Sequence, residues 1–126
     1  MDYELATEKD WPQIIEMVSE KHYVPEPYSL GGHWLVAKNG EKIYGTIWFF
    51  MEMPHVFIDY WTASHGRIAA KLMAKLQLIC GEVGIKYLHA TIHESDKGAL
   101  RLAVQGFGGI DDGPYRRVFK EIPNGV

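Results

Sequence analysis

The chain has 126 residues, of which 47% are hydrophobic and 23% charged, a composition typical of a soluble globular protein with one core. Its formal net charge of −3 argues against a general nucleic-acid-binding protein, and its 1 cysteine, Cys80, cannot form an internal disulfide. Because it lacks a run of roughly 18 apolar residues, and Met1-Asp2-Tyr3-Glu4 lacks the basic and apolar regions of a signal peptide, we expect a cytoplasmic protein with no membrane partner.

In the first third of the chain, the pattern predicts a short strand, a helix and a loop. Residues 2–6 can form the strand. We expect the helix to begin at Asp10, with Asp10 and Gln13 as a capping box, and to run to about His22. Prolines and glycines among aromatic residues then predict a loop over 23–33. The apolar face of the helix consists of Ile14, Ile15, Val18 and, on its flank, Met17.

The middle of the chain predicts three strands and one long helix. Strands over 34–38 and 42–51 flank Asn39-Gly40, a dipeptide typical of tight hairpin turns. Pro54 separates them from a strand over 55–62. From Gly66 to about Gly84, apolar residues recur at three- and four-residue spacing, which indicates a helix with one buried face. These residues are Ile68, Leu72, Leu76, Ile79, Cys80 and Val83.

A strand over 86–93, a helix over 96–105 and a hairpin around 111–114 complete the pattern. The predicted order is strand-helix-strand-strand-strand-helix-strand-helix-strand-strand. The fold class is therefore α+β, with a mixed, largely antiparallel sheet.

The turn Ala63-Ser64-His65-Gly66 joins the strand over 55–62 directly to the long helix. The first turn of a helix has free N–H donors and the positive end of the helix dipole, so a strand that leads straight into a helix builds an anion site. The sequence therefore suggests a ligand that carries phosphate.

Asp59 is the acidic residue of that strand, and it shares a strand face with Phe57 and Trp61 because residues two apart point the same way. We expect aromatic neighbours to strip water from its carboxylate. Such a carboxylate suits a general base, which takes a proton from an ammonium group directly or through water. The alternative is a structural aspartate satisfied by backbone N–H groups or by an arginine.

Two further patterns, one of basic residues and one of histidines, bear on ligand binding. Arg67, Lys71 and Lys75 recur every four residues and form a basic stripe, in which Arg67 suits phosphate oxygens and Lys75 a solvated face. His89 and His93 have the spacing of a chelating pair, but on a strand they lie about 13 Å apart. Because zinc–ligand bonds are near 2 Å, we expect no metal site.

The chain resembles the GNAT N-acetyltransferase family over nearly its whole length, and three stretches carry this resemblance. They are Leu5-Ala6-Thr7 with Asp10 and Ile14, the hairpin Asn39 to Gly45, and Ala99-Leu100-Arg101-Leu102 leading to Gly106-Phe107. The resemblance implies one acyltransferase domain over 1–126. It also implies a sheet that opens like a V between its fourth and fifth strands, with helices on both faces.

In that family, the fourth strand and the next helix hold acetyl-coenzyme A (acetyl-CoA) through a loop of the form Arg/Gln-x-x-Gly-x-Gly/Ala. Here the loop reads Ser64-His65-Gly66-Arg67-Ile68-Ala69, with Arg67 at the central glycine and Ser64 at the leading Arg/Gln. Gly66, Ala69 and Ala70 still allow close approach of a pyrophosphate to the backbone. The resemblance assigns the coenzyme to Tyr60, Trp61, Thr62, Ser64, His65, Gly66, Arg67, Ile68, Ala69, Ala70 and Ser95.

The resemblance also implies direct transfer of an acetyl group to an amine, a reaction in which Asp59 would be the base that its position on the strand suggests. Leu102 stands where the family often has a tyrosine acid, so Tyr115 or water would protonate the departing thiolate. Small polyamines, antibiotics and protein amines all stay open as acceptors, and so does a homodimer.

The rival interpretation is an inactive GNAT-like domain that binds another protein, similar to small phage-encoded members of the family. It is motivated by the departures at Ser64, Arg67 and Leu102. It predicts that His65 and Arg67 fill the coenzyme cleft and that a partner covers an aromatic surface around Tyr23, Tyr28 and Trp34.

Overall fold

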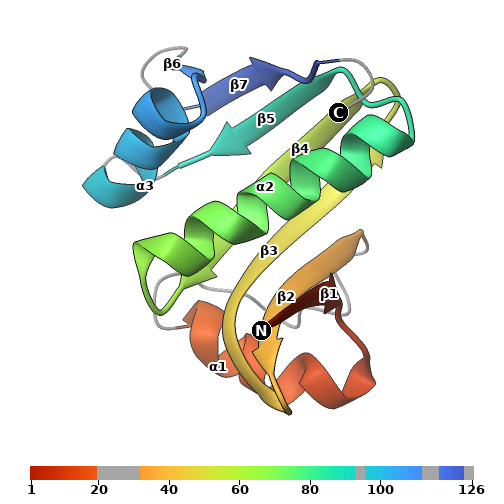
Figure 1. Ribbon diagram of the computed structural model, residues 1–126, viewed down its shortest axis with the longest axis vertical. Helices are drawn as coiled ribbons and strands as arrows, with labels where there is room; N and C mark the ends of the chain where they lie inside the picture. The colour runs from red at the N-terminus through yellow and green to blue at the C-terminus, as the bar shows by residue number, and fades with distance from the viewer. Residues whose placement is uncertain (20–31, 93–95, 112–116, 124–126) are drawn as a thin grey trace. The chain divides into compact units, whose positions relative to one another are not determined.

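The computed structural model of the protein describes residues 1–19, 32–92, 96–111 and 117–123 (Figure 1). The predicted order of elements is confirmed. The strands are β1 (Asp2–Leu5), β2 (His33–Asn39), β3 (Lys42–Glu52), β4 (His55–Ala63), β5 (Tyr87–Thr91), β6 (Ile110–Asp111) and β7 (Arg117–Glu121). The helices are the 3-10 turn η1 (Glu8–Asp10), α1 (Trp11–Ser19), α2 (Gly66–Glu82), α3 (Lys97–Arg101) and the π-helical η3 (Leu102–Gly106).

Within the described residues, the strands form a 7-stranded sheet in the order β1-β2-β3-β4-β5-β7-β6. β4 and β5 are parallel, whereas β1–β2, β2–β3, β5–β7 and β6–β7 are antiparallel. The prediction of a mixed, largely antiparallel sheet is therefore confirmed, as is the prediction that the strands over 55–62 and 86–93 are neighbours. Their pairing ends at Ile58 and Ala90, and β4 continues past this ladder to Ala63.

The chain divides into two compact units. The first unit comprises Met1–Phe50 and Tyr60–Leu76, and the second comprises Met51–Asp59 and Gln77–Val126. β3, β4 and α2 each contribute residues to both units.

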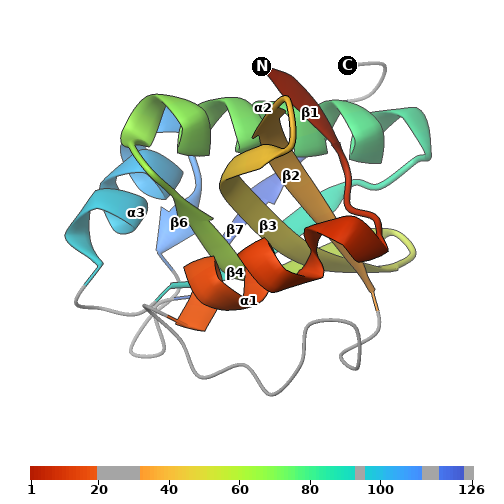
Figure 2. The same ribbon diagram turned by 90° about the horizontal axis from the view of Figure 1, so that it is seen from below.

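In the first unit, α1 and α2 cover opposite faces of β2 and β3 (Figure 2). On the α1 face, Ile14 and Val18 are buried in a cluster with Trp34, Val36 and Trp48. Every residue from Trp34 to Ala37 is buried, because both faces of β2 are covered. Trp34 is only 3% exposed, so the predicted aromatic surface is wrong at this residue; Tyr23 and Tyr28 lie outside the described residues.

The β2–β3 hairpin is confirmed, but its turn is one position later than predicted. Asn39 pairs with Lys42, so Gly40 and Glu41 form the turn. Gly40 adopts a φ of 65°, a conformation that glycine adopts without steric cost.

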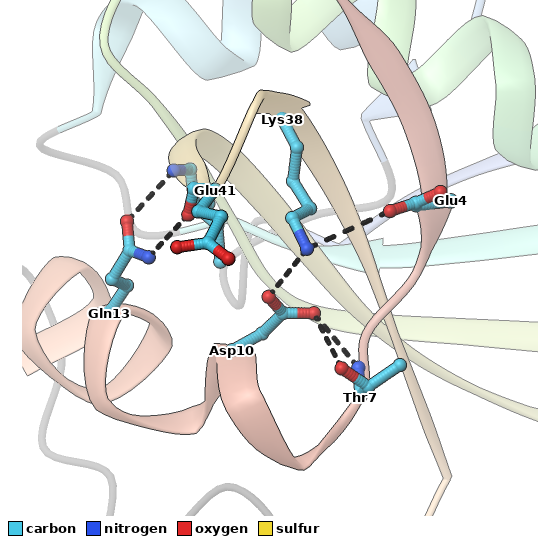
Figure 3. Close-up of polar contacts among 7 residues, drawn as sticks. Glu4, Thr7, Asp10, Gln13, Lys38 and Glu41 are labelled. Atoms are coloured by element: carbon cyan, nitrogen blue, oxygen red, sulfur yellow. Dashed lines mark hydrogen bonds and ion pairs between the residues drawn. The ribbon is translucent and has the colours of Figure 1, made fainter.

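The start of the first helical segment corrects the predicted capping box. The backbone N–H of Thr7 donates to Oδ2 of Asp10 at 2.9 Å, so Thr7 is the N-cap and Asp10 the acidic third residue of the box. Gln13 instead binds the hairpin: its Nε2 donates to the Glu41 carbonyl at 2.7 Å, and its Oε1 accepts from the Ile43 N–H at 2.8 Å (Figure 3).

Asp10 is buried at 2% exposure and lies 2.9 Å from Nζ of Lys38, which also reaches Oε1 of Glu4 at 3.7 Å (Figure 3). Burial opposes ionisation of Asp10, but the Thr7 N–H and the Lys38 ammonium outweigh it and hold the pKa of the carboxyl below its ordinary value. We call Thr7, Asp10, Gln13 and Lys38 the α1 polar network.

In the second unit, α2 ends where the sequence predicts. Gly84 has a φ of 88°, and the Ile85 N–H donates to the Cys80 carbonyl at 2.9 Å, as in a glycine-terminated helix. Burial raises the pKa of the Cys80 thiol to about 12. Val83 is 52% exposed, so its predicted burial is wrong, because it lies beyond the last helical turn.

The helix predicted over 96–105 consists of two segments. Asp96 caps α3 by accepting the Ala99 N–H at 3.1 Å, and the chain then continues as η3. Among the described residues, no helix is long and apolar enough to cross a lipid bilayer.

Candidate functional site

The junction between β4 and α2 lies within the first unit and forms a helix N-terminus without a capping side chain among the described residues. The Ser64 N–H donates to the Tyr44 carbonyl at 2.8 Å, which ties the turn to β3. The His65 carbonyl accepts from the N–H groups of Ile68 and Ala69, both at 3.2 Å. The N–H groups of Gly66 and Arg67 have no acceptor among the described residues. These two donors point to an external acceptor such as a phosphate oxygen.

The surroundings of this helix start favour an anion. Ser64, His65, Gly66 and Arg67 are all exposed, and a Cβ added at Gly66 would meet nothing within 4 Å. The first turn of α2 contains no acidic residue, so nothing opposes the positive end of the helix dipole. Arg67 adds a guanidinium, and Lys71 and Lys75 extend the exposed basic stripe along α2.

Two contacts with the sheet hold the first turns of α2 in place. A Cβ at Gly45 would lie 2.8 Å from Leu72, 2.9 Å from Ala63 and 3.1 Å from Ile68, so only a glycine lets β3 approach α2 this closely. The indole Nε1–H of Trp61 donates to the Ala69 carbonyl at 3.1 Å. Together with the Ser64–Tyr44 bond, these contacts preform the turn.

The predicted coenzyme residues that the structure describes fall into three groups by exposure. The exposed Ser64 to Arg67 form the open turn, whereas Tyr60, Trp61, Ala69 and Ala70 are half-buried. The side chains of Thr62 and Ile68 are buried, which leaves only their backbone groups for a ligand. Ser95 and Tyr115 lie outside the described residues.

Asp59 differs from its prediction in its surroundings. Val56 and Ile58 are the buried residues of this part of β4, and Asp59 is exposed. The expected loss of hydration is therefore wrong: alternation turns Asp59 away from the buried side, and half-buried aromatic neighbours do not enclose it. Its side chain is open to solvent.

The sequence pattern missed a histidine pair in the second unit. Nδ1 of His55 lies 2.9 Å from Nε2 of His89, and these rings form an aromatic group with Phe57 and Tyr87. The pair arises because β4 and β5 align Phe57 with His89, a register that the sequence does not reveal. His93, the other half of the rejected chelating pair, lies outside the described residues. Among those described, no three metal-ligating side chains gather.

Comparison with known proteins defines the fold. No protein-family model matches the sequence, and no curated protein sequence matches it significantly. Many solved structures do match. A GNAT-family acetyltransferase from Staphylococcus aureus has a TM-score of 0.78 at 15% identity, covering 97% of this chain and 99% of that one.

Two further structures are similar over almost their full length. A ribosomal-protein-alanine N-acetyltransferase from Brucella melitensis has a TM-score of 0.71 at 17% identity, covering 94% of this chain and 97% of that one. The diaminobutyrate acetyltransferase EctA from Paenibacillus lautus, in complex with L-2,4-diaminobutyric acid and coenzyme A, has a TM-score of 0.73 at 17% identity, with coverage of 97% and 94%. The chain therefore has the GNAT fold, as its sequence suggested.

Proposed function

We propose that the protein is an N-acetyltransferase that binds acetyl-CoA at the β4–α2 junction and transfers the acetyl group to an amine. The observation that carries this proposal is the pair of N–H groups at Gly66 and Arg67, which lack an acceptor among the described residues at an exposed helix start. The chain has the GNAT fold, and one of its structural neighbours is in complex with coenzyme A. An exposed helix N-terminus in this fold suits the pyrophosphate of the coenzyme.

The turn over 64–70 would hold the pyrophosphate, with Arg67 beside it. The pantetheine arm resembles a peptide and would pair with the backbone of Tyr60, Trp61 and Thr62. This role is supported by the end of the β4–β5 pairing at Ile58, which leaves these residues outside that ladder. Ser95, which lies outside the described residues, stays a proposed coenzyme-binding residue.

The reaction requires a neutral amine. The amine nitrogen forms a bond to the thioester carbonyl carbon, the carbon–sulfur bond breaks, and the thiolate leaves. We propose Asp59 as the group that receives the amine proton, through water because its side chain is exposed. The half-buried Leu102 has no proton to give, so the thiolate takes its proton from Tyr115 or from water.

Coenzyme binding can be tested by thermal unfolding with millimolar acetyl-CoA, since a ligand of the folded state stabilises it by about 2.7 kcal/mol at 100 times its Kd. An upward shift of Tm is expected. Adenosine monophosphate at the same concentration serves as the control, since it lacks the pyrophosphate and the pantetheine arm. Equal shifts with both ligands, or no shift with acetyl-CoA, would contradict the proposal and favour the inactive protein-binding domain.

The proposed base can be tested by replacing Asp59 with Asn. Loss of a general base lowers kcat by about 100-fold or more, whereas the affinity for acetyl-CoA should stay within twofold. Unchanged turnover would refute the role of Asp59. The assay follows thiol release with small polyamines, aminoglycosides and peptides that carry a free N-terminus or a lysine, since the acceptor class stays open.

The same proposal places the protein in the cytoplasm, where reducing conditions suit its one cysteine, the buried Cys80.

A further inference from the structure

Trp61 joins its strand to the helix that follows it. Its side chain is half-buried, and its Nε1–H donates to the Ala69 carbonyl at 3.1 Å. Ala69 lies just after Gly66 and Arg67, whose N–H groups lack an acceptor among the described residues. The bond therefore joins the end of β4 to the first turn of α2, across the turn that the chain makes between them.

Three contacts fix this turn, and they differ in kind. The Ser64–Tyr44 bond joins two backbone groups, and Gly45 provides room for Leu72 and Ile68. Neither contact can be removed by shortening a side chain. The Trp61 bond can, because replacing the indole with a phenyl ring deletes the donor and adds no atom. Trp61 is thus the residue at which the positioning of the turn can be separated from the packing beneath it.

The bond between Trp61 and Ala69 helps to fix the direction in which the N–H groups of Gly66 and Arg67 point. An anion gains most from a helix start when the N–H groups already converge on its position, since ordering them during binding costs affinity. By holding the Ala69 carbonyl, the indole limits rotation of the first turn of α2 relative to β4. The same strand supplies the backbone proposed to pair with the pantetheine arm, so the contact also sets the spacing between the two proposed subsites.

We propose that Trp61 is a positioning residue for the pyrophosphate of acetyl-CoA, acting through the Ala69 carbonyl on the N–H groups of Gly66 and Arg67. This inference rests on the proposed function. It goes beyond the predicted role of Trp61, which involved only its backbone.

The test compares Trp61→Phe with Trp11→Phe, a matched control that removes an indole from α1 in the same unit, on the face opposite α2. Isothermal titration with coenzyme A should show binding about threefold to tenfold weaker for Trp61→Phe, the effect of one hydrogen bond. Trp11→Phe should bind like the unmodified protein. Equal affinity for all three proteins, or equal losses in both variants, would overturn the role of Trp61.

A second readout separates positioning from general weakening. With an active acceptor, the KM for acetyl-CoA should rise in Trp61→Phe while kcat stays within twofold. S-acetylpantetheine, which lacks the pyrophosphate, should be used equally well by both proteins. An equal loss with both donors would show that Trp61 supports the fold rather than the phosphate site.

If Trp61→Phe does not fold, amide hydrogen exchange of the unmodified protein tests the same proposal. In the unmodified protein without ligand, the amides of Ile68 to Leu72 should already be protected, and coenzyme A should add protection mainly at Gly66 and Arg67. A first turn that becomes protected only with the ligand would overturn preformation by Trp61. Failure of the unmodified protein to bind coenzyme A in any of these experiments would instead refute the proposed function.

Discussion

Two regions of the first unit, the α1 polar network and the β4–α2 junction, each fix a helix to neighbouring strands, but they do so with different chemical groups. The α1 polar network fixes a helix to a hairpin through side chains, with a buried carboxylate paired to an ammonium (Figure 3). The β4–α2 junction presents backbone N–H groups and is fixed by one backbone bond, one indole and one glycine. Side-chain contacts restrict which residues are allowed, whereas backbone donors survive changes of side chain. Because the junction relies on backbone donors, the side chain of Arg67 can stand there without removing an N–H group from the site.

The largest expected effect on stability is at Gly45, because β3 can approach α2 at the junction only where no side chain stands between them. Gly45→Val would place methyl groups against Leu72, Ala63 and Ile68, each of which has an atom within 3.1 Å of the position that a Cβ alone would take. We expect a loss of about 3 kcal/mol in the free energy of unfolding, typical of an overfilled core. Denaturation by urea measures it.

Gly98→Ala is the matched control for this prediction. Its added Cβ would meet only the Asp96 carboxylate at 3.9 Å, an ordinary contact on α3. Its stability should be unchanged or slightly higher. Similar losses in both variants would mean that the approach of β3 to α2 is not the constraint.

The next effect is at the α1 polar network. Asp10→Ala removes the acceptor of the Thr7 N–H and the partner of Lys38. We expect a loss of about 2 kcal/mol, since a buried charged group leaves its donors unsatisfied when it is removed. Glu4→Ala removes the longer, exposed contact to Lys38 and should change little. Equal effects of the two substitutions would show that the network acts as a surface ion pair.

The network also makes stability depend on pH. The pKa of Asp10 lies below its ordinary value of 3.8 in the folded protein, so the folded state favours the ionised carboxylate. This contribution is present above the unfolded-state pKa and is lost as pH falls through the lower, folded-state value. Unfolding curves from pH 6 to pH 2 should therefore show a steeper loss in the unmodified protein than in Asp10→Asn. Parallel pH profiles would contradict the pairing.

The two regions also differ in what local sequence can reveal. The helix from Gly66 and the hairpin near Gly40 were predictable, because periodicity and turn preferences act within a few residues. The capping box was misplaced because Asp10 suits either end of such a box, and Lys38, which lies far along the chain, helps to decide between them.

The site was predictable only in outline for a related reason. Strand alternation gives the face of Asp59 but not what covers that face, and its exposure depends on neighbouring elements. The His55–His89 pair depends on the register of two parallel strands, and the Trp61–Ala69 bond on the angle between strand and helix. Each of these is a property of tertiary structure.

The smallest expected effect tests most directly whether the backbone holds the phosphate. Arg67→Gly removes the guanidinium, yet it leaves the N–H groups of Gly66 and of residue 67 in place. The affinity for coenzyme A should therefore change by less than about threefold, the loss of one exposed charge near a phosphate. Arg67→Glu places a negative charge at the same helix start and should weaken binding by about tenfold. Lys75→Glu makes the same charge change farther along α2 and should have little effect, because the field of the helix start falls off within its first turn. If Arg67→Gly abolished binding, the guanidinium rather than the backbone would hold the phosphate, and the junction would depend on its side chains as much as the α1 polar network does.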